Sequence, residues 1–489
     1  MYKKLFFFFI LLQSPFILKA QDMIGLTSSN YSGISGAMIN PSSLSFMKTR
    51  MDIRILGNQT FGFNTAYYIP AKDNKGLGFI NTPLPVYGSQ KENYIYYNNK
   101  DQKQLYIDQR ILGPAFSLTY KKHTIGFSTQ FRAMATSDKI PYELPIIQYE
   151  GLKYKDLHNI RFSDFEFSAA TQAWAEFALS YSYVVHSSFA NRIAVGASLK
   201  LLKGNTGAYL ENQNVNFFIG NDTTIYINNL IAKAGYSSPL HLDSKTYDSD
   251  PTFKGSGVGL DIGFTYMNAK RAYEINTFRK RQCEIPYDDY NFKFGVSILD
   301  IGAITYNQNA RAHFYDGVSA KWKDPKISFD SFNGLFHTFD TLFYGKNGAG
   351  NSVVAEKITI GLPTALSIQG DIHINKNWYT SVLYTQPIKL YKYSLTRPAF
   401  MGITPRYETR NFEAGIPLSL LSYTYPQVGM YMRFGFFTIG TEQLLNFLGW
   451  NNLNGANIYF SFKINLQKGS CFNAYESPCH SYRSNFRRK

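Results

Sequence analysis

Apolar and polar side chains alternate along much of this chain, and the last long run shows the pattern most fully. From Ile458 to Leu466, five apolar residues occupy one parity, while polar residues such as Ser461 and Lys463 occupy the other. Successive side chains of a β-strand point to opposite faces, so this run predicts a strand with one apolar face. Soluble edge strands and membrane-facing strands share this pattern, so the rest of the chain must distinguish them.

Runs of the same kind recur along the chain. In the run 256–269, apolar residues from Val258 to Tyr266 alternate with glycine, aspartate and threonine, and the run 427–434 alternates in the same way. With a first strand from Met51, the runs number about fourteen, an even count that places both chain ends on one side of a membrane barrel. The other runs cover about 110–121, 123–135, 172–186, 191–205, 289–315, 356–375, 377–388, 399–410, 411–424, 436–443 and 455–466.

The predicted connections alternate in length. Outer-membrane barrels have short turns on the periplasmic side and long loops outside. We therefore predict an all-β fold: a transmembrane antiparallel β-barrel of about fourteen strands with a short N-terminal luminal plug and long extracellular loops. The long loops are expected at about 70–109, 136–171, 206–255 and 316–355, with short joints near Lys121, Ser187, Lys376 and Arg410 and one longer joint at 270–288.

Charged residues within the predicted strands share the parity that faces the lumen. An arginine or lysine on the lipid face near the membrane midplane would cost about 2–4 kcal/mol, so a closed barrel should keep its charges inside. Two interpretations stay open: the charges pair with each other or with the plug, or they line a selective path for an ion or substrate. The luminal charges are Asp52, Arg54, Arg132, Glu176, Lys200, Asp261, Lys293, Arg433 and Lys463.

The two ends of the chain fall outside the barrel pattern. Residues 1–20 place two lysines before a short apolar run and have a cleavage site after Ala20, which predicts export with a removable signal peptide. Residues 21–50 are small and polar, so this segment either hangs in the periplasm or folds into the lumen as a plug. Residues 51–466 form the predicted barrel, and residues 467–489 form a basic periplasmic tail.

The tail contains Cys471 and Cys479, which are close enough in sequence to form a disulfide in an oxidising compartment. Its basic charge suits docking to another envelope protein or to acidic lipid headgroups. A disordered extension would carry the same charge, and charge alone does not separate these interpretations.

Composition fits an exported membrane barrel and offers no sign of an enzyme. Aromatic residues make up 17% of the chain and charged residues also 17%, as expected for a lipid-facing wall bounded by aromatic girdles. The formal net charge is +16, yet lysine and arginine do not cluster within the barrel, so nucleic acid is not an expected partner. The eight histidines show no metal-ligand spacing and no Gly-x-Ser-x-Gly elbow occurs, so we expect no catalytic site, metal or cofactor.

Three short motifs resemble a known family. The N-terminal segment ends in Asn40-Pro41-Ser-Ser-Leu44, Gly295–Tyr306 reads GVSILDIGAITY, and Phe437–Leu445 reads FTIGTEQLL. In these motifs the chain resembles the long-chain fatty-acid transporter superfamily of outer-membrane barrels, closest to the Bacteroidota branch that includes type IX secretion barrels and uncharacterised relatives. The resemblance implies a plug motif of Asn40, Pro41 and Leu44, and a place in the outer membrane of a Gram-negative bacterium, in contact with outer-membrane lipid.

Two functions follow. The favoured one is a non-enzymatic structural or accessory subunit of a cell-envelope complex for secretion or assembly, which would bind other envelope proteins through its tail or loops. The alternative is a transporter of hydrophobic small molecules, which needs an apolar pocket between the outer loops and the lumen and a kinked strand that opens the wall. Leu299–Gly302 interrupts the run 289–315 and is the expected kink. The charged lumen argues against an apolar passage, and a plugged lumen argues against a general porin.

Overall fold

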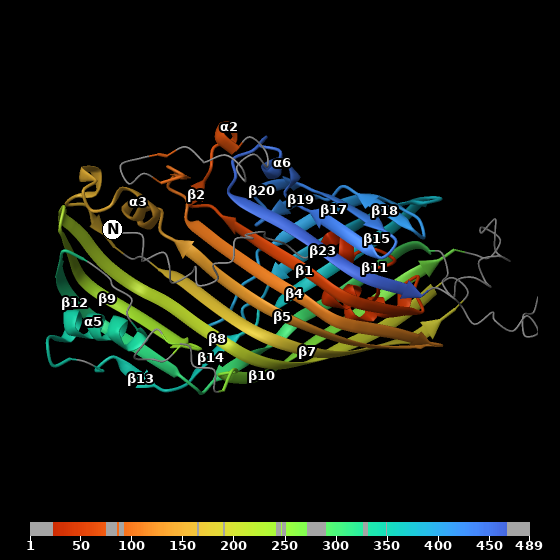
Figure 1. Ribbon diagram of the computed structural model, residues 1–489, viewed down its shortest axis with the longest axis horizontal. Helices are drawn as coiled ribbons and strands as arrows, with labels where there is room; N and C mark the ends of the chain where they lie inside the picture. Colours follow the sequence, from red (N-terminus) through yellow and green to blue (C-terminus); the bar gives the residue numbers. More distant parts are fainter. Residues whose placement is uncertain are drawn as a thin grey trace, which may run out of the picture.

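The structure, a computed structural model, describes residues 23–74, 86–87, 92–163, 166–188, 191–240, 246, 251–270, 290–325, 331–348 and 350–466. Antiparallel strands form one closed wall around a lumen (Figure 1). The wall closes because β1 (Met51–Asn64) pairs with β4 (Lys103–Tyr120) on one side and with the last strand, β23 (Gly455–Leu466), on the other. The fourteen-stranded barrel predicted from the alternation is confirmed.

Each barrel strand pairs with the barrel strands that precede and follow it in the chain, and three of the fourteen positions are each built from two short strands in line. Between β4 and β23 the wall consists of β5 (His123–Ile140), β7 (Phe167–Ser187), β8 (Asn191–Asn221), β10 (Gly255–Ala269), β11 (Tyr290–Tyr306), β14 (Ile358–Gly361) with β15 (Ala365–Asn375), β16 (Trp378–Pro387), β17 (Phe400–Glu408), β18 (Phe412–Gly415) with β19 (Leu418–Leu421), β20 (Tyr425–Val428) with β21 (Met430–Phe434), and β22 (Phe437–Thr441).

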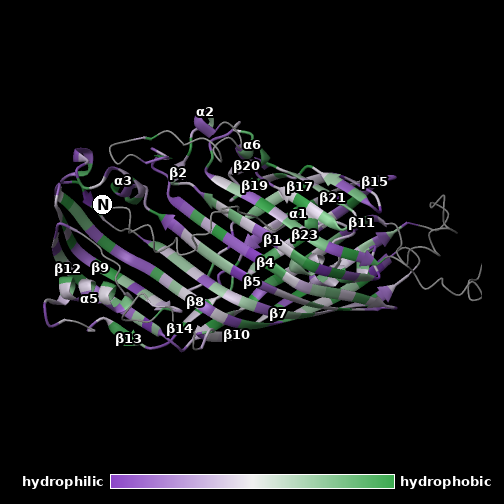
Figure 2. Cartoon of the chain, viewed as in Figure 1, coloured by the Kyte–Doolittle hydropathy of each residue, from purple (hydrophilic) through white to green (hydrophobic). Residues whose placement is uncertain are grey.

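The two faces of the wall differ in polarity. Leu179, Leu199 and Leu260 lie side by side on three neighbouring strands and point outward, with exposed fractions of 56%, 53% and 37%. The alternation of green with white or purple along the strands shows the same change from face to face (Figure 2). An exposed apolar band around a closed wall is stable in lipid, so the barrel spans a membrane. Other strands contribute Ile111, Ile125, Phe294, Ile372, Val382, Ile403, Leu418, Met430, Ile439 and Ile464 to this band.

Within the described part of the chain, no helix is both long and apolar enough to cross a membrane.

The short joints lie where the alternation predicts them. Lys121 and Lys376 adopt positive φ angles of 53° and 45° in tight turns between neighbouring strands. Near Arg410 the chain reverses between β17 and β18, and the Thr409 amide donates to the Phe412 carbonyl at 2.7 Å. The longer joint expected at 270–288 lies outside the described residues except for its first residue.

The far end of the wall differs from prediction. Residues 207–221 of β8 continue past the barrel and pair with β9 (Thr224–Ser237), which pairs with β12 (Ala310–Lys323). We call this part of β8, with β9, β12, β13 (Val353–Ala355) and α5 (Phe332–Tyr344), the extension. The predicted loops 206–255 and 316–355 are therefore wrong in part, because strand pairing does not stop where the membrane ends. The predicted run 289–315 is two strands, β11 and β12, separated by residues 307–309.

Short elements lie in the remaining outer loops. The apolar side of helix α3 packs against the extension, because Ile146 lies in one buried cluster with Phe217 and Ile219 of β8. These elements are α2 (Ala71–Asn74), β2 (Tyr67–Tyr68), β3 (Ile95–Tyr96), α3 (Glu143–Glu150), η5 (Lys155–Leu157), β6 (Arg161–Phe162) and α6 (Leu444–Phe447).

The N-terminal segment lies inside the barrel. Residues 23–50 form α1 (Ile24–Thr27), η2 (Gly33–Met38) and η3 (Pro41–Phe46), drawn in red within the wall in Figure 1. None of these residues is exposed. The segment enters beside the end of the last strand, where the Arg50 amide donates to the Leu466 carbonyl at 3.1 Å. The lumen is therefore occupied by residues 23–50 of the chain itself.

Candidate functional site

The Asn-Pro motif fixes the N-terminal segment to the wall. Asn40 caps η3, and its side-chain oxygen accepts from the Ser42 amide at 3.0 Å. Its amide nitrogen donates to the Phe264 carbonyl at 3.1 Å and to Gln369 Oε1 at 2.9 Å, on two separate strands. Because both ends of this side chain are used, Asn40 joins a helical turn to the barrel wall.

Glycines of the wall leave room for this motif. A Cβ atom added to Gly196 would lie 2.5 Å from the Ser42 amide nitrogen and 2.7 Å from the Pro41 carbonyl carbon. A Cβ atom at Gly263 would overlap the Asn40 side chain. The third residue of the predicted plug motif, Leu44, is buried in a small apolar cluster with Ile34, Ala37 and Ala115.

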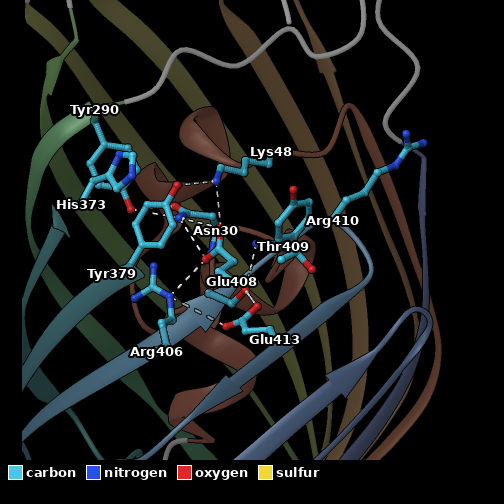
Figure 3. A network of polar contacts seen from close by, with 12 residues as sticks. Asn30, Lys48, Tyr290, His373, Tyr379, Arg406, Glu408, Thr409, Arg410 and Glu413 are labelled. Carbon is cyan, nitrogen blue, oxygen red and sulfur yellow. Dashed lines mark hydrogen bonds and ion pairs between the residues drawn. The ribbon is translucent and has the colours of Figure 1, made fainter. Parts of the chain in front are cut away.

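A second contact with the wall is ionic, and we call it the anchor network (Figure 3). Lys48 Nζ lies 2.9 Å from Glu408 Oε1 and also donates to the Tyr379 hydroxyl at 2.9 Å. Asn30 Nδ2 donates to Glu408 Oε1 at 3.0 Å, and Arg406 Nε lies 3.1 Å from Glu408 Oε2. Burial opposes the charge on Lys48, but Glu408 and Tyr379 outweigh it, so the pKa of Lys48 lies above its usual range.

The anchor network continues along the inner wall through acid–base pairs. Arg406 Nη2 lies 2.8 Å from Asp371 Oδ2, and Lys293 Nζ lies 3.6 Å from the same oxygen. Arg433 Nε lies 3.2 Å from Glu413 Oε2, which also accepts from the Ser29 hydroxyl at 2.7 Å. The N-terminal segment is thus held at several points by charges that would otherwise be buried without partners.

A separate ionic group, the Asp300 cluster, lies nearer the extension. It contains three cations, Arg132, Lys200 and Arg397, and three carboxylates, Glu176, Asp261 and Asp300. The Asp300 carboxylate is fully buried and lies 3.0 Å from Arg132 and 2.5 Å from Lys200, and it also pairs with Arg397. The formal charges of these six groups sum to zero.

Asp300 lies at a break in the wall. It adopts a φ of +54°, its amide donates to Asp261 Oδ1 at 2.6 Å, and the β10–β11 register shifts at this point. On its other side β11 pairs with β15 up to Leu299 and with β14 from Ala303, so residues 300–302 face the gap 362–364. The kink expected at Leu299–Gly302 is present in the strand. We call residues 300–302 and 362–364 the wall break.

The loop between β16 and β17, residues 388–399, folds into the lumen. The Gly361 amide donates to the Tyr393 carbonyl at 2.8 Å, and Leu395 is buried among residues that include Trp174 and Ile360. The loop also reaches the facing strands, because the Thr396 amide donates to Thr136 Oγ1 on β5 at 3.3 Å.

Two pockets lie on either side of this loop, and both are lined by Thr136 and Thr396. The first we call the inner pocket. The second we call the outer pocket, and its lining includes charged residues such as Asp138, Glu211 and Lys392. The inner pocket is lined by Phe61, Tyr106, Ile107, Asp108, Arg110, Met134, Thr136, Thr396, Arg397, Pro398 and Phe400.

The inner pocket rests on the N-terminal segment. Phe61 and Tyr106 belong to one buried apolar cluster with Met23 and Leu26, and Phe400 packs with Ile24. Its charged groups have protein partners, since Arg110 pairs with Asp108 at 2.6 Å. A molecule in this pocket would therefore meet mainly apolar and aromatic surface with a few polar groups, which is the usual composition of a small-molecule site.

The predicted luminal charges lie on the inner wall, and their partners are each other, other inner-wall carboxylates such as Asp300, Asp371 and Glu413, or the N-terminal segment. Arg132, Glu176, Lys200 and Asp261 meet in the Asp300 cluster, and Lys293 and Arg433 lie in the anchor network. The other three contact the N-terminal segment: Asp52 accepts from the Ile34 amide at 3.0 Å, Arg54 Nη1 donates to Ser35 Oγ at 3.5 Å, and Lys463 donates to the Tyr31 carbonyl.

Several site residues were missed by the sequence analysis. Arg406 and Glu408 share the inner parity of β17, so the alternation could have identified them. Arg397 and Lys48 lie outside strands, where parity gives no direction. The predicted signal peptide and the pair Cys471 and Cys479 lie outside the described residues. Within the described ranges, no group of three or more His, Cys, Asp or Glu residues is placed to hold a metal ion.

Together, the wall and its interior define a class: a membrane-spanning β-barrel of the outer-membrane type whose lumen holds its own N-terminal segment. Within this class, the chain belongs to a family described as "Family of unknown function (DUF5723)", whose sequence model matches residues 51–442. The match begins at the first residue of β1 and ends after β22.

The chain is also similar, at low identity, to solved structures of outer-membrane transporters. The chain is similar to the toluene transporter TbuX of Ralstonia pickettii, with 10% identity, coverage of 89% of this chain and 94% of that chain, and a TM-score of 0.41. The toluene transporter TodX of Pseudomonas putida has 10% identity, with coverage of 92% of this chain and 99% of that chain and a TM-score of 0.40. A FadL homologue of Pseudomonas aeruginosa has 10% identity, with coverage of 88% of this chain and 92% of that chain and a TM-score of 0.25. No curated protein matches the sequence. Similarity of this degree concerns the fold alone, and the link to type IX secretion stays a prediction.

Proposed function

We propose that this barrel transports a small, mainly apolar molecule across the outer membrane by way of the inner pocket. The observation that carries the proposal is the position of that pocket: it lies inside the wall, rests on the N-terminal segment and is covered by loop 388–399. Phe61, Tyr106 and Phe400 provide its aromatic surface.

The interior fits this function better than a water-filled channel. The N-terminal segment fills the lumen below the pocket, and the luminal charges are engaged in pairs within the wall or with that segment. The charged lumen, which argued against an apolar passage at the sequence level, is thus compatible with an apolar pocket above it. The wall break at Asp300 lies next to the pocket, because Arg397 lines the pocket and pairs with Asp300.

The accessory-subunit function favoured by the sequence gains no support. It was based on the long loops, the basic tail, the longer joint at 270–288 and the resemblance to secretion barrels. The tail, residues 467–489, lies outside the described residues, as does the joint except for its first residue. The function therefore rests on the pocket, and the transport alternative takes first place.

A pocket-filling variant tests the proposal. The purified barrel in detergent should bind the fluorescent apolar probe N-phenyl-1-naphthylamine in a saturable manner, and Met134→Trp should weaken that binding at least about tenfold, because the larger ring occupies the pocket. Ile439→Trp, on the lipid face, is the matched control and should leave binding unchanged. Non-saturable binding, or equal binding by both variants, would contradict the proposal.

A further inference from the structure

Loop 388–399 separates two spaces that would otherwise be continuous. The inner and outer pockets share Thr136 and Thr396 in their linings, and the hydrogen bond from the Thr396 amide to Thr136 Oγ1 crosses the boundary between them at 3.3 Å. The outer pocket is lined by Tyr209 and Glu211 of the extension, whereas the inner pocket is lined by Phe61 and Tyr106, which cluster with the N-terminal segment.

One side chain of the loop ties both sides of the wall break. The Arg397 guanidinium pairs with Asp300 on β11, and its Nε donates to the Pro363 carbonyl at 3.1 Å, between β14 and β15. The wall break has two further closures, from the Leu362 amide to the Gly302 carbonyl at 2.9 Å and from Thr364 Oγ1 to the Asp300 carbonyl at 2.7 Å. The loop position and the closed wall are therefore held by the same arginine.

The Asp300 cluster is arranged so that Arg397 can leave. Without Arg397, the Asp300 carboxylate still lies 3.0 Å from Arg132 and 2.5 Å from Lys200, so it keeps two cationic partners while the formal charge of the cluster falls from zero to −1. A buried carboxylate that paired with Arg397 alone would be left without any counter-charge when Arg397 moved away. Apart from one isolated bridge at Ser394, the loop itself contains no helix or strand that would resist movement.

We infer that loop 388–399 is a gate between the outer and inner pockets, and that Arg397 is its latch. When the latch opens, the two pockets join and the wall break loses one of the three groups that tie its two sides. This inference rests on the proposed function, because a gate has a role only where a molecule passes.

A reversible cross-link tests the gate. Thr136→Cys/Thr396→Cys places two thiols at the boundary, and the matched control Ser180→Cys/Ser198→Cys links β7 to β8, where the hydroxyls lie 2.7 Å apart and away from the loop. The oxidised gate variant should exchange N-phenyl-1-naphthylamine at least about tenfold more slowly than the reduced form, and the control pair should exchange equally in both forms. Equal exchange by the oxidised and reduced gate variant would overturn the inference.

A second measurement needs no bound molecule. Ser394→Cys places a thiol on the loop, and its rate of reaction with a maleimide reports loop opening. Adding Arg397→Gln should raise that rate about tenfold, because a charge-assisted contact is lost. Adding Lys392→Gln instead, which removes only a half-exposed pair with Glu211 at 3.6 Å, should change the rate less than twofold. An unchanged rate in the Arg397 variant would contradict the latch.

The outcomes separate the two proposals. If the wild-type barrel does not bind the probe but Arg397→Gln frees the loop, the gate stands and the proposed substrate class fails. If the probe binds and the cross-link has no effect, the transport function stands and the gate fails. Heat-dependent mobility on a gel, which reports closure of the barrel, checks that each variant is folded.

Discussion

Gly263 shows how a missing side chain can position a functional segment. Its position on β10 would overlap Asn40 if it carried a Cβ atom, so alanine there should displace the Asn-Pro motif from the wall. We expect Gly263→Ala to make residues 23–50 accessible to protease while the barrel stays closed. Gly370→Ala is the matched control, because a Cβ atom there meets nothing closer than 3.7 Å. Identical cleavage patterns for the two variants would show that the close approach does not matter.

His313 should make the extension sensitive to acid. It lies on β12, where its ring stacks on Phe336 of α5 at 3.8 Å and its Nδ1 is 2.8 Å from Ser352 Oγ. Burial lowers the pKa of His313 from 6.5 to about 4. Between these pH values the unfolded imidazole binds a proton that the folded one excludes, so the extension loses stability as the pH falls from 6.5 to 4, by about 3 kcal/mol in all.

Hydrogen exchange of β9 and β12 measures this loss. Intrinsic amide exchange slows as the pH falls, so exchange of β9 and β12 should slow less between pH 7 and pH 5 than the intrinsic chemistry predicts, and the double variant His313→Phe/Ser352→Ala should not show this excess. The phenylalanine keeps the stacked ring and cannot take up a proton, and the alanine removes the hydroxyl that would be left without a partner. An excess that persists in the double variant would assign the effect to another group.

Parity explains which residues the sequence could identify. Side chains such as Arg132 and Lys200 lie within regular strands, so their alternation with apolar neighbours fixes the face they occupy. Asp300 lies at a bulge, where the alternation is interrupted and the direction of a side chain is no longer determined. Arg397 and Lys48 reach the lumen from loops, and only tertiary structure places them there.

At the scale of elements, the N-terminal segment depends on Glu408. This carboxylate accepts from Lys48 and Asn30 of the segment and pairs with Arg406 of its own strand. Glu408→Gln would leave Lys48 buried without its counter-charge, and losing one partner of a buried pair costs about 3–5 kcal/mol. We expect the segment to detach, measured as protease cleavage before Met51. Glu356→Gln, at an exposed glutamate between β13 and β14, should have no such effect.

The extension shows why the strand ends could not be predicted from membrane thickness. The prediction ended strands where a membrane-spanning strand should end, and therefore placed loops at 206–255 and 316–355. The backbone hydrogen bonds between β8 and β9 run from the pair of Gly207 with Ser237 to the pair of Asn221 with Thr224. This pairing continues beyond the membrane, because backbone hydrogen bonds between strands do not require lipid. Membrane thickness bounds the lipid-facing part of a strand and not its total length.

At the scale of the whole molecule, the lipid boundary can be mapped with charges. Leu199 and Val354 are both exposed apolar residues, at 53% and 61%, but Leu199 lies within the barrel wall and Val354 lies in the extension. Leu199→Arg should destabilise the folded barrel by about 2–4 kcal/mol in lipid bilayers, whereas Val354→Arg should cost little. Urea titration of the barrel folded into vesicles provides the measurement. Equal costs would place the extension in the membrane or Leu199 outside it.

The closed barrel itself was predictable because one simple pattern repeats along the chain. Fourteen runs with a period of two, separated by connections of alternating length, leave few alternatives to an antiparallel barrel. What the barrel contains was not predictable in the same way. The N-terminal segment has no strand period, and its place in the lumen follows from individual contacts such as Asn40 with Gln369.

The contacts of the N-terminal segment also set an order for folding. The Ile24 amide bonds Glu442, and the Gly25 amide bonds Tyr459, across separations of 418 and 434 residues. Contacts of such range form late, after most of the chain has collapsed. Because Lys463 of β23 also bonds the Tyr31 carbonyl, the final seam with β1 and the seating of the segment belong to one step. If β1 and β23 paired before the N-terminal segment entered the lumen, the segment would stay outside the barrel and the lumen would be an open pore.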